Sequence, residues 1–120
     1  MKNITLNDWL NGKNINSNVE SILRIIDNAL IHAAEDTRRG KGRISFGELK
    51  PKKSLIILFW QANGVKLQVN ANHYPDYSKF GFVTPRYKEH GEKGFMEYII
   101  TEASQLNEEL IKFLIKGLKL

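Results

Sequence analysis

Apolar residues recur at helical spacing in a first stretch near the start of the chain. Ser17 and Glu20 form a capping box there, the usual signature of a helix N-terminus. The apolar positions that follow are Val19, Ile22, Leu23, Ile26, Leu30 and Ala33. This spacing predicts an amphipathic helix that begins at Ser17 and ends at Gly40. Arg38 and Arg39 would then lie in its last turn, where cations suit the helix dipole.

A second amphipathic stretch closes the sequence. Ser104 is a candidate N-cap, because a serine hydroxyl can accept a hydrogen bond from the first turn of a helix. The apolar positions of this stretch are Leu106, Leu110, Phe113, Leu114 and Leu118. They predict a second helix with one buried face.

Between these stretches the pattern changes from helical to strand-like. The predicted strands cover residues 43–49, 55–60, 65–70 and 95–101. Residues 55–60 are apolar at every position, which is typical of a strand covered on both faces, whereas residues 65–70 alternate and predict one wet face. Asn63 and Gly64 predict a hairpin turn, since both residues tolerate positive φ.

Two segments show little regular pattern. Residues 1–16 are rich in Asn and Gly and are expected to be loosely structured, with Thr5 capping one short turn. Residues 71–93 contain two prolines and scattered aromatics, which predict a long loop with one short strand near residues 80–83. Long loops in small domains are often functional.

The order of elements predicts the fold class. Two amphipathic helices need a common apolar surface, and a sheet with one apolar face supplies it. We therefore expect one α+β domain over residues 1–120, in which four or five mostly antiparallel strands form a meander. The N-terminal and C-terminal helices would pack on one face of that sheet. A chain of 120 residues is long enough for one such core.

Composition narrows the chemistry and the compartment. The sequence contains no cysteine, which excludes disulfides, cysteine zinc sites and thiol nucleophiles and fits a reducing cytoplasm. Its longest apolar run, residues 55–60, is too short to span a bilayer, and its first residues do not resemble a signal peptide. We expect a soluble, cytoplasmic protein without a membrane partner.

Charge is distributed unevenly along the chain. The net charge is +5, which favours polyanions without singling them out. Seven of the 18 Lys and Arg residues lie between Arg38 and Lys53, where Glu48 is the only acid. A strand of about six residues spans roughly 20 Å, so this basic stretch divides into a cluster at residues 38–43 and another at residues 50–53.

These observations indicate a candidate nucleic-acid-binding surface. Its first part is the cluster at residues 38–43, and its second part combines aromatic and basic residues of the loop, as in single-strand binding platforms. The candidate residues are Arg38, Arg39, Lys41, Arg43, Tyr74, Tyr77, Arg86, Tyr87 and Lys88. The structural alternative is that the bases are solvated rims of the sheet and that the aromatics hold the loop on the core.

Catalytic chemistry has a weaker signal. Glu48 and Lys50 have the Glu-x-Lys spacing of restriction-type nucleases, in which the carboxylate holds a divalent metal. The neighbouring strand, residues 55–60, supplies no second carboxylate. The histidines at positions 32, 73 and 90 lack the spacing of metal ligands. We therefore assign no catalytic residues, no metal ligands and no cofactor.

Three segments carry a resemblance to a known kind of domain: "RRGKGRISFGELKPKKSLIILFW", "KEHGEKGFMEYIIT" and "SQLNEELIKFLIKGL". Over residues 38–118 the chain resembles a small uncharacterised bacterial α+β domain that is fused to restriction-associated proteins and to predicted transport proteins. The resemblance implies a similar fold and a role near nucleic-acid-handling or phage-defence systems. It implies no catalytic residues.

Three hypotheses follow from the sequence. The first is a non-enzymatic module that binds nucleic acid, or a nucleic-acid-processing or defence partner, through a basic surface. The second is a protein-interaction or homodimerisation domain that uses the sheet face or an edge strand. The third is a metal-dependent nuclease built on Glu48 and Lys50.

Overall fold

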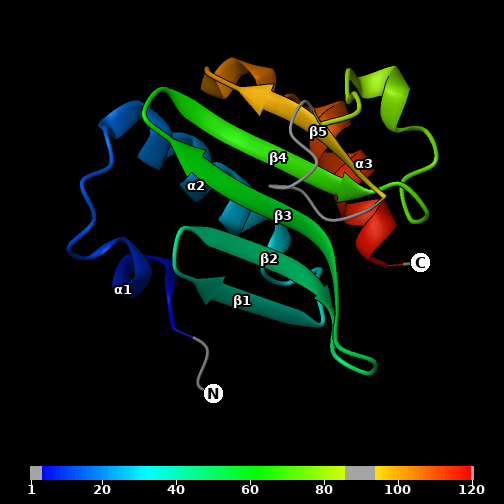
Figure 1. Ribbon diagram of the computed structural model, residues 1–120, viewed down its shortest axis with the longest axis horizontal. Helices are drawn as coiled ribbons and strands as arrows, with labels where there is room; N and C mark the ends of the chain where they lie inside the picture. Colours follow the sequence, from blue (N-terminus) through cyan, green and yellow to red (C-terminus); the bar gives the residue numbers. More distant parts are fainter. Residues whose placement is uncertain (1–3, 86–93, 120) are drawn as a thin grey trace.

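The computed structural model describes residues 4–85 and 94–119 of the chain. Five strands form one antiparallel sheet, in which each strand pairs with the next along the chain (Figure 1). The strands are Asp36–Gly40 (β1), Arg43–Glu48 (β2), Lys53–Gln61 (β3), Gly64–Asn70 (β4) and Phe95–Ile100 (β5). The α-helices are Leu6–Leu10 (α1), Ser17–Leu30 (α2) and Glu108–Leu118 (α3), and the short 3₁₀ helices are Tyr77–Phe80 (η1) and Ala103–Gln105 (η3). The predicted α+β meander is confirmed.

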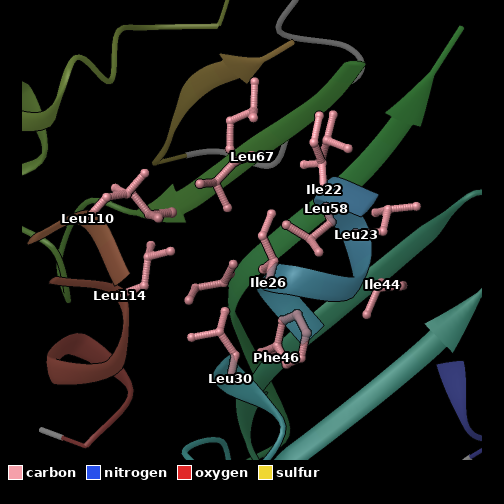
Figure 2. Close-up of a cluster of buried hydrophobic side chains, with 14 of the residues drawn as sticks. Ile22, Leu23, Ile26, Leu30, Ile44, Phe46, Leu58, Leu67, Leu110 and Leu114 are labelled. Carbon is pink, nitrogen blue, oxygen red and sulfur yellow. The ribbon is translucent and has the colours of Figure 1, made fainter. Parts of the chain in front are cut away.

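One face of the sheet carries the core. Figure 1 shows α2 and α3 on the same side of the sheet, as the two apolar stripes predicted. Ile44, Leu58 and Leu67 face one another across β2, β3 and β4, and all three are buried. Figure 2 shows the apolar side chains of α2 directed toward this row, with Leu110 and Leu114 of α3 beside it. Each fully buried aliphatic side chain contributes about 1.5–3 kcal/mol to the hydrophobic stabilisation of the fold.

The first long helix, α2, begins at Ser17 as predicted, but its N-cap lies one residue earlier and the helix ends earlier than predicted. Its N-cap is Asn16, whose side-chain oxygen accepts a hydrogen bond from Val19 N at 2.8 Å. The same side chain donates to Ala62 O in the β3–β4 turn, at 2.5 Å. The prediction that Ser17 caps the helix was therefore wrong by one residue, because Asn16 can bond the helix and the turn together.

The prediction that this helix extends to Gly40 was also wrong. The helix ends at Leu30, and residues 36–40 form the edge strand β1. The two-residue turn Lys41–Gly42 connects β1 to β2, and Gly42 has a φ of 81° that suits glycine. Arg38 and Arg39 are thus strand residues, and the helix dipole does not account for them.

The strand pattern of β1 is hidden in the sequence because its core-facing residues are polar. Thr37 and Arg39 pair with Phe46 and Ile44, and both are buried. The guanidinium of Arg39 forms an ion pair with Asp27 of α2 at 2.5 Å, with side chains that are 2% and 5% exposed. This pair joins the edge strand to the helix.

The β3–β4 hairpin was predicted correctly, although its turn lies one residue earlier. Ala62 and Asn63 form the turn, and Gly64 is the first residue of β4. A β-carbon on Gly64 would lie 2.6 Å from Ile100 O. The glycine is therefore explained by the close approach of β5, and no positive φ is involved.

The ends of the chain and the loop after β4 differ in detail from the predictions. Thr5 does cap a short helix, α1, by accepting a hydrogen bond from Asp8 N at 3.1 Å. The predicted strand over residues 80–83 is reduced to a single bridge between Val83 and Glu97, preceded by η1. The N-cap of helix α3 is Asn107, whereas Ser104 lies in η3. The predicted cap at Ser104 was therefore wrong.

The second face of the sheet, opposite the helices, is less exposed to solvent than predicted. One row across all five strands contains Arg38, Ser45, Ile57, Gln68 and Glu97. Ile57 and Gln68 are at most 1% exposed. Gln68 donates to Glu97 at 3.3 Å, and Lys66 lies 3.7 Å from the same carboxylate. The alternation in β4 thus predicted the two faces correctly but overestimated how much of the polar one is exposed.

Within the part of the chain that the structure describes, no helix has both the length and the apolar character needed to cross a bilayer.

Candidate functional site

The first basic cluster divides into two buried or paired arginines and two exposed residues. Arg39 forms an ion pair with Asp27 and also donates a hydrogen bond to Ile4 O at 2.7 Å. Arg38 lies 3.2 Å from Asp36 and donates to Ser54 Oγ at 3.0 Å. Lys41 and Arg43 are exposed at the β1–β2 turn. Both arginines of β1 therefore bond within the fold, and the exposed bases of this cluster are Lys41 and Arg43.

The loop residues of the predicted surface lie elsewhere. Tyr74 is 1% exposed and donates its hydroxyl to Leu114 O of α3 at 2.7 Å. Burial raises the pKa of Tyr74 well above its usual range. Tyr77 is half-buried against the core. The remaining candidates, Arg86, Tyr87 and Lys88, lie outside the described residues.

The strand register separates these two parts of the predicted surface. Arg43 pairs with Phe59, which pairs with Lys66, so the β1–β2 turn lies at the end of the sheet where β4 begins. Tyr74 follows β4 and therefore lies at the opposite end. Among the described candidates, the structure does not bring the first cluster and the loop together.

The second basic cluster does meet the loop. Lys50, Lys52 and Lys53 are all exposed at the β2–β3 turn. Nζ of Lys53 lies 3.5 Å from Nε2 of His73, the third residue after β4. The same Nε2 lies 3.7 Å from Oε1 of Glu48. The turn that the sequence suggested was a separate rim is thus in contact with the start of the loop.

His73 also lines a pocket between the loop and α3. The pocket has a volume of about 520 Å³ and lies beside residues 73–76, Phe80 and one face of α3. The helix residues that line it are Glu109, Lys112, Phe113, Lys116 and Gly117. Such a volume is within the range of about 300–1,000 Å³ that is typical of small-molecule sites.

Aromatic rings form the apolar part of this pocket. Phe80 and Phe113 are stacked, with ring centroids 4.2 Å apart and an interplanar angle of 21°. Tyr74 meets Phe113 edge-on at 5.2 Å. Both phenylalanines are only half-buried, so part of the stack faces the pocket.

Charges of both signs surround the rings. Lys112 pairs with Glu108 at 3.0 Å, and Asp76 lies 3.8 Å from Lys79, but all four side chains are highly exposed. Such exposed pairs hold their partners weakly and exchange readily.

We use the name lysine corner for the six basic residues that border this end of the molecule. They are Lys50, Lys52, Lys53, His73, Lys112 and Lys116. Of the turn lysines, Lys53 contacts His73, which lines the pocket, and the helix lysines line the pocket directly. The lysine corner therefore combines residues from segments that are about 60 positions apart in the sequence.

Sequence reasoning missed several of these residues although a signal was present. Glu109, Lys112, Phe113 and Lys116 are spaced i, i+3, i+4 and i+7, so they share one face of a helix. Phe113 was assigned to the buried stripe, which is only partly correct because it is half-buried. Nothing in the sequence alone could show that Lys53 contacts His73, which borders the same pocket as this helix face.

The nuclease hypothesis gains no support from the geometry. Glu48 lies near His73 and pairs in register with Lys53, whereas Lys50 lies in the turn. Among residues 4–85 and 94–119 there is no group of three His, Cys, Asp or Glu side chains that could hold a metal ion.

Comparisons of the chain with protein-family models, with curated proteins and with solved structures found no match. The resemblance to the small bacterial α+β domain fused to restriction-associated and predicted transport proteins therefore stays a prediction.

Proposed function

We propose that this protein is a non-enzymatic module that binds single-stranded nucleic acid through the lysine corner. The observation that carries the proposal is the 3.5 Å approach of Lys53 Nζ to Nε2 of His73, a residue that lines the aromatic pocket. Proteins that bind single strands combine a positively charged surface, which follows the phosphates, with aromatic side chains on which bases stack. Both components are present here within one end of the molecule.

This proposal moves the binding surface away from most of the residues that the sequence indicated. Arg38 and Arg39 are left out of the proposed binding surface because each is bonded within the fold, and Tyr74 is left out because it is buried. Lys41 lies at the other end of the sheet and serves as a control of equal charge. The contacts among the described residues favour neither the dimer nor the nuclease.

The direct test is fluorescence anisotropy with single-stranded oligonucleotides of about 10 nucleotides, a length within the usual site size of such proteins. Affinity is expected to fall steeply between about 50 and 200 mM salt, because phosphate contacts release counterions. A variant that combines Lys52→Gln and Lys53→Gln removes up to two phosphate contacts, which lowers the slope of log K against log salt by about 1.4.

Lys41→Gln is the matched control, since it removes the same type of charge from the opposite end of the sheet. Lys41→Gln is expected to change the affinity for single strands by much less than Lys52→Gln or Lys53→Gln alone. If the protein has no affinity for single strands at low salt, or if Lys41→Gln weakens binding as much as the double variant, the proposal is wrong.

A further inference from the structure

The charges around the pocket do not suit a simple anion. Asp76 and Glu109 line the pocket together with Lys112 and Lys116. A bare phosphate bound there would be attracted by the two ammonium groups but would also lie near two carboxylates. Neither Glu109 nor Lys116 has an ion-pair partner among the described residues, so both keep their charge available for a ligand.

A nucleotide unit separates the two kinds of charge that this pocket offers. Its phosphate is an anion and suits lysine, whereas its base is an aromatic ring. Adenine, cytosine and guanine also carry an exocyclic amino group, which donates hydrogen bonds. A carboxylate accepts but cannot donate, so it pairs with such an amino group. Thymine and uracil carry no amino group, and their single N3–H is flanked by two carbonyl oxygens that repel a carboxylate.

The floor of the pocket supplies the remaining requirement. Phe80 and Phe113 form a stacked pair whose rings reach the pocket, and a base can extend this stack by one more ring. Phe113 is fixed from behind by Tyr74 and Phe82, at centroid distances of 5.2 Å and 6.1 Å. The aromatic surface is thus held in place before any ligand binds, which lowers the entropic cost of binding.

We infer that this pocket holds one unstacked base of the bound strand and selects bases that carry an amino group. Phe80 and Phe113 would stack on the base, and Glu109 and Asp76 would accept hydrogen bonds from its amino group. Lys112 and Lys116 would bind the phosphates next to it. The inference rests on the proposed function, because the neighbouring phosphates need the turn lysines of the lysine corner.

The test compares strands of equal length and charge that differ only in the base. Oligocytidylate and oligothymidylate are titrated against the protein by anisotropy, with ribo-oligocytidylate as a further arm and free cytidine monophosphate as the single-unit probe. Oligocytidylate, as DNA or RNA, is expected to bind about tenfold more tightly than oligothymidylate. The free nucleotide is expected to bind far more weakly than the strand, since it lacks the phosphates that the turn lysines contact.

Two substitutions assign this selectivity to the pocket. Glu109→Gln is expected to bring the two affinities within about twofold of each other, because an amide can donate as well as accept. Its control is Glu20→Gln, which removes a glutamate from the first turn of α2, away from the pocket. Phe80→Leu is expected to weaken both strands by about fivefold or more. Its control is Phe59→Leu, a half-buried phenylalanine on the second face of the sheet.

The outcomes separate this inference from the proposed function. Equal affinity for the two strands, together with normal binding by Phe80→Leu, overturns the pocket inference. The proposed function stands in that case if the lysine double variant still loses affinity. Tight binding of the free nucleotide, equal to that of the strand, also overturns the inference. No binding of any strand overturns both.

Discussion

Gly117 of α3 lies against the ring of Tyr74, with no room for a side chain between them. A β-carbon on Gly117 would lie 2.7 Å from Cδ1 of the tyrosine and closer still to Cε1 and Cζ. The ring cannot move away easily, because it is buried and its hydroxyl is bonded to Leu114 O. The contact fixes the loop after β4 to α3, and it therefore shapes the candidate pocket.

Gly117→Ala is expected to destabilise the protein by about 1–3 kcal/mol, which is the usual cost of overpacking a core. This is the reverse of the gain of about 1 kcal/mol expected for Gly→Ala in an open helix. Urea denaturation followed by circular dichroism measures the change. In a Tyr74→Ala background the clash is absent, so Gly117→Ala should there be neutral or stabilising. A loss of stability in both backgrounds would contradict the explanation.

The buried phenol predicts a loss of stability at alkaline pH. Burial raises the pKa of Tyr74 in the folded state, so the unfolded chain releases this proton first. The stability linked to this proton is fully present below about pH 10, the pKa of tyrosine in the unfolded chain. Above that pH the free energy of unfolding falls by up to about 1.36 kcal/mol per pH unit.

The measurement for the phenol is the free energy of unfolding between about pH 9 and 11, compared with that of Tyr74→Phe. The variant should be less stable near neutral pH by about 1 kcal/mol, since it lacks the hydrogen bond to Leu114. Its stability should also fall less steeply above pH 10. Tyr77→Phe is the control, because Tyr77 is only half-buried. Equal slopes for the wild type and Tyr74→Phe would argue against the prediction.

The start of α2 predicts unequal effects for two adjacent residues. Asn16→Ala removes the cap and the bond to Ala62, and should cost about 1–2 kcal/mol. Ser17→Ala should change stability by less than about 0.5 kcal/mol, because Ser17 is exposed and its side chain forms no hydrogen bond with the described residues. Thermal or urea melts of the two variants decide whether the cap is Asn16 or the serine that the sequence suggested.

The Arg39–Asp27 pair predicts a strong dependence on keeping both partners. Asp27→Ala leaves a guanidinium buried without its counter-charge and should cost about 3–5 kcal/mol. Replacing both residues with apolar ones, Asp27→Leu with Arg39→Met, should recover most of that loss. Urea denaturation of the wild type, the Asp27→Ala variant and the double variant measures these changes in the free energy of unfolding. A single variant that loses less than about 1 kcal/mol would show that Arg39 is not held as the structure indicates.

Most of the fold could be predicted from periodicity, because the core follows it closely. The stripes that contain Ile26 and Leu114 are buried, as is the alternating row that contains Leu67. The strand β1 could not be predicted in this way, since its inward positions are Thr37 and Arg39 rather than apolar residues. A buried ion pair has no periodic signature, so the pattern was interpreted as the end of a helix.

The candidate site was harder to predict than the fold. Individual features were visible, including the lysines of the β2–β3 turn and the aromatics near residue 80. Their relative positions depend on the sheet register, which brings Lys53 next to His73, and on the packing of α3 over Tyr74. These contacts join residues that are far apart in the sequence, and no local sequence pattern indicates which distant residues meet.

The order of the strands also has a consequence for how the chain folds. Each strand pairs with its neighbour in the sequence, and the first three hairpins close over turns of a few residues. Closing a short loop costs little chain entropy, so these hairpins can form without the helices. The contact between α2 and α3, by contrast, joins the two ends of the chain. We expect the helices to meet last, on a sheet that is already assembled, so that removing either helix leaves the other without its partner.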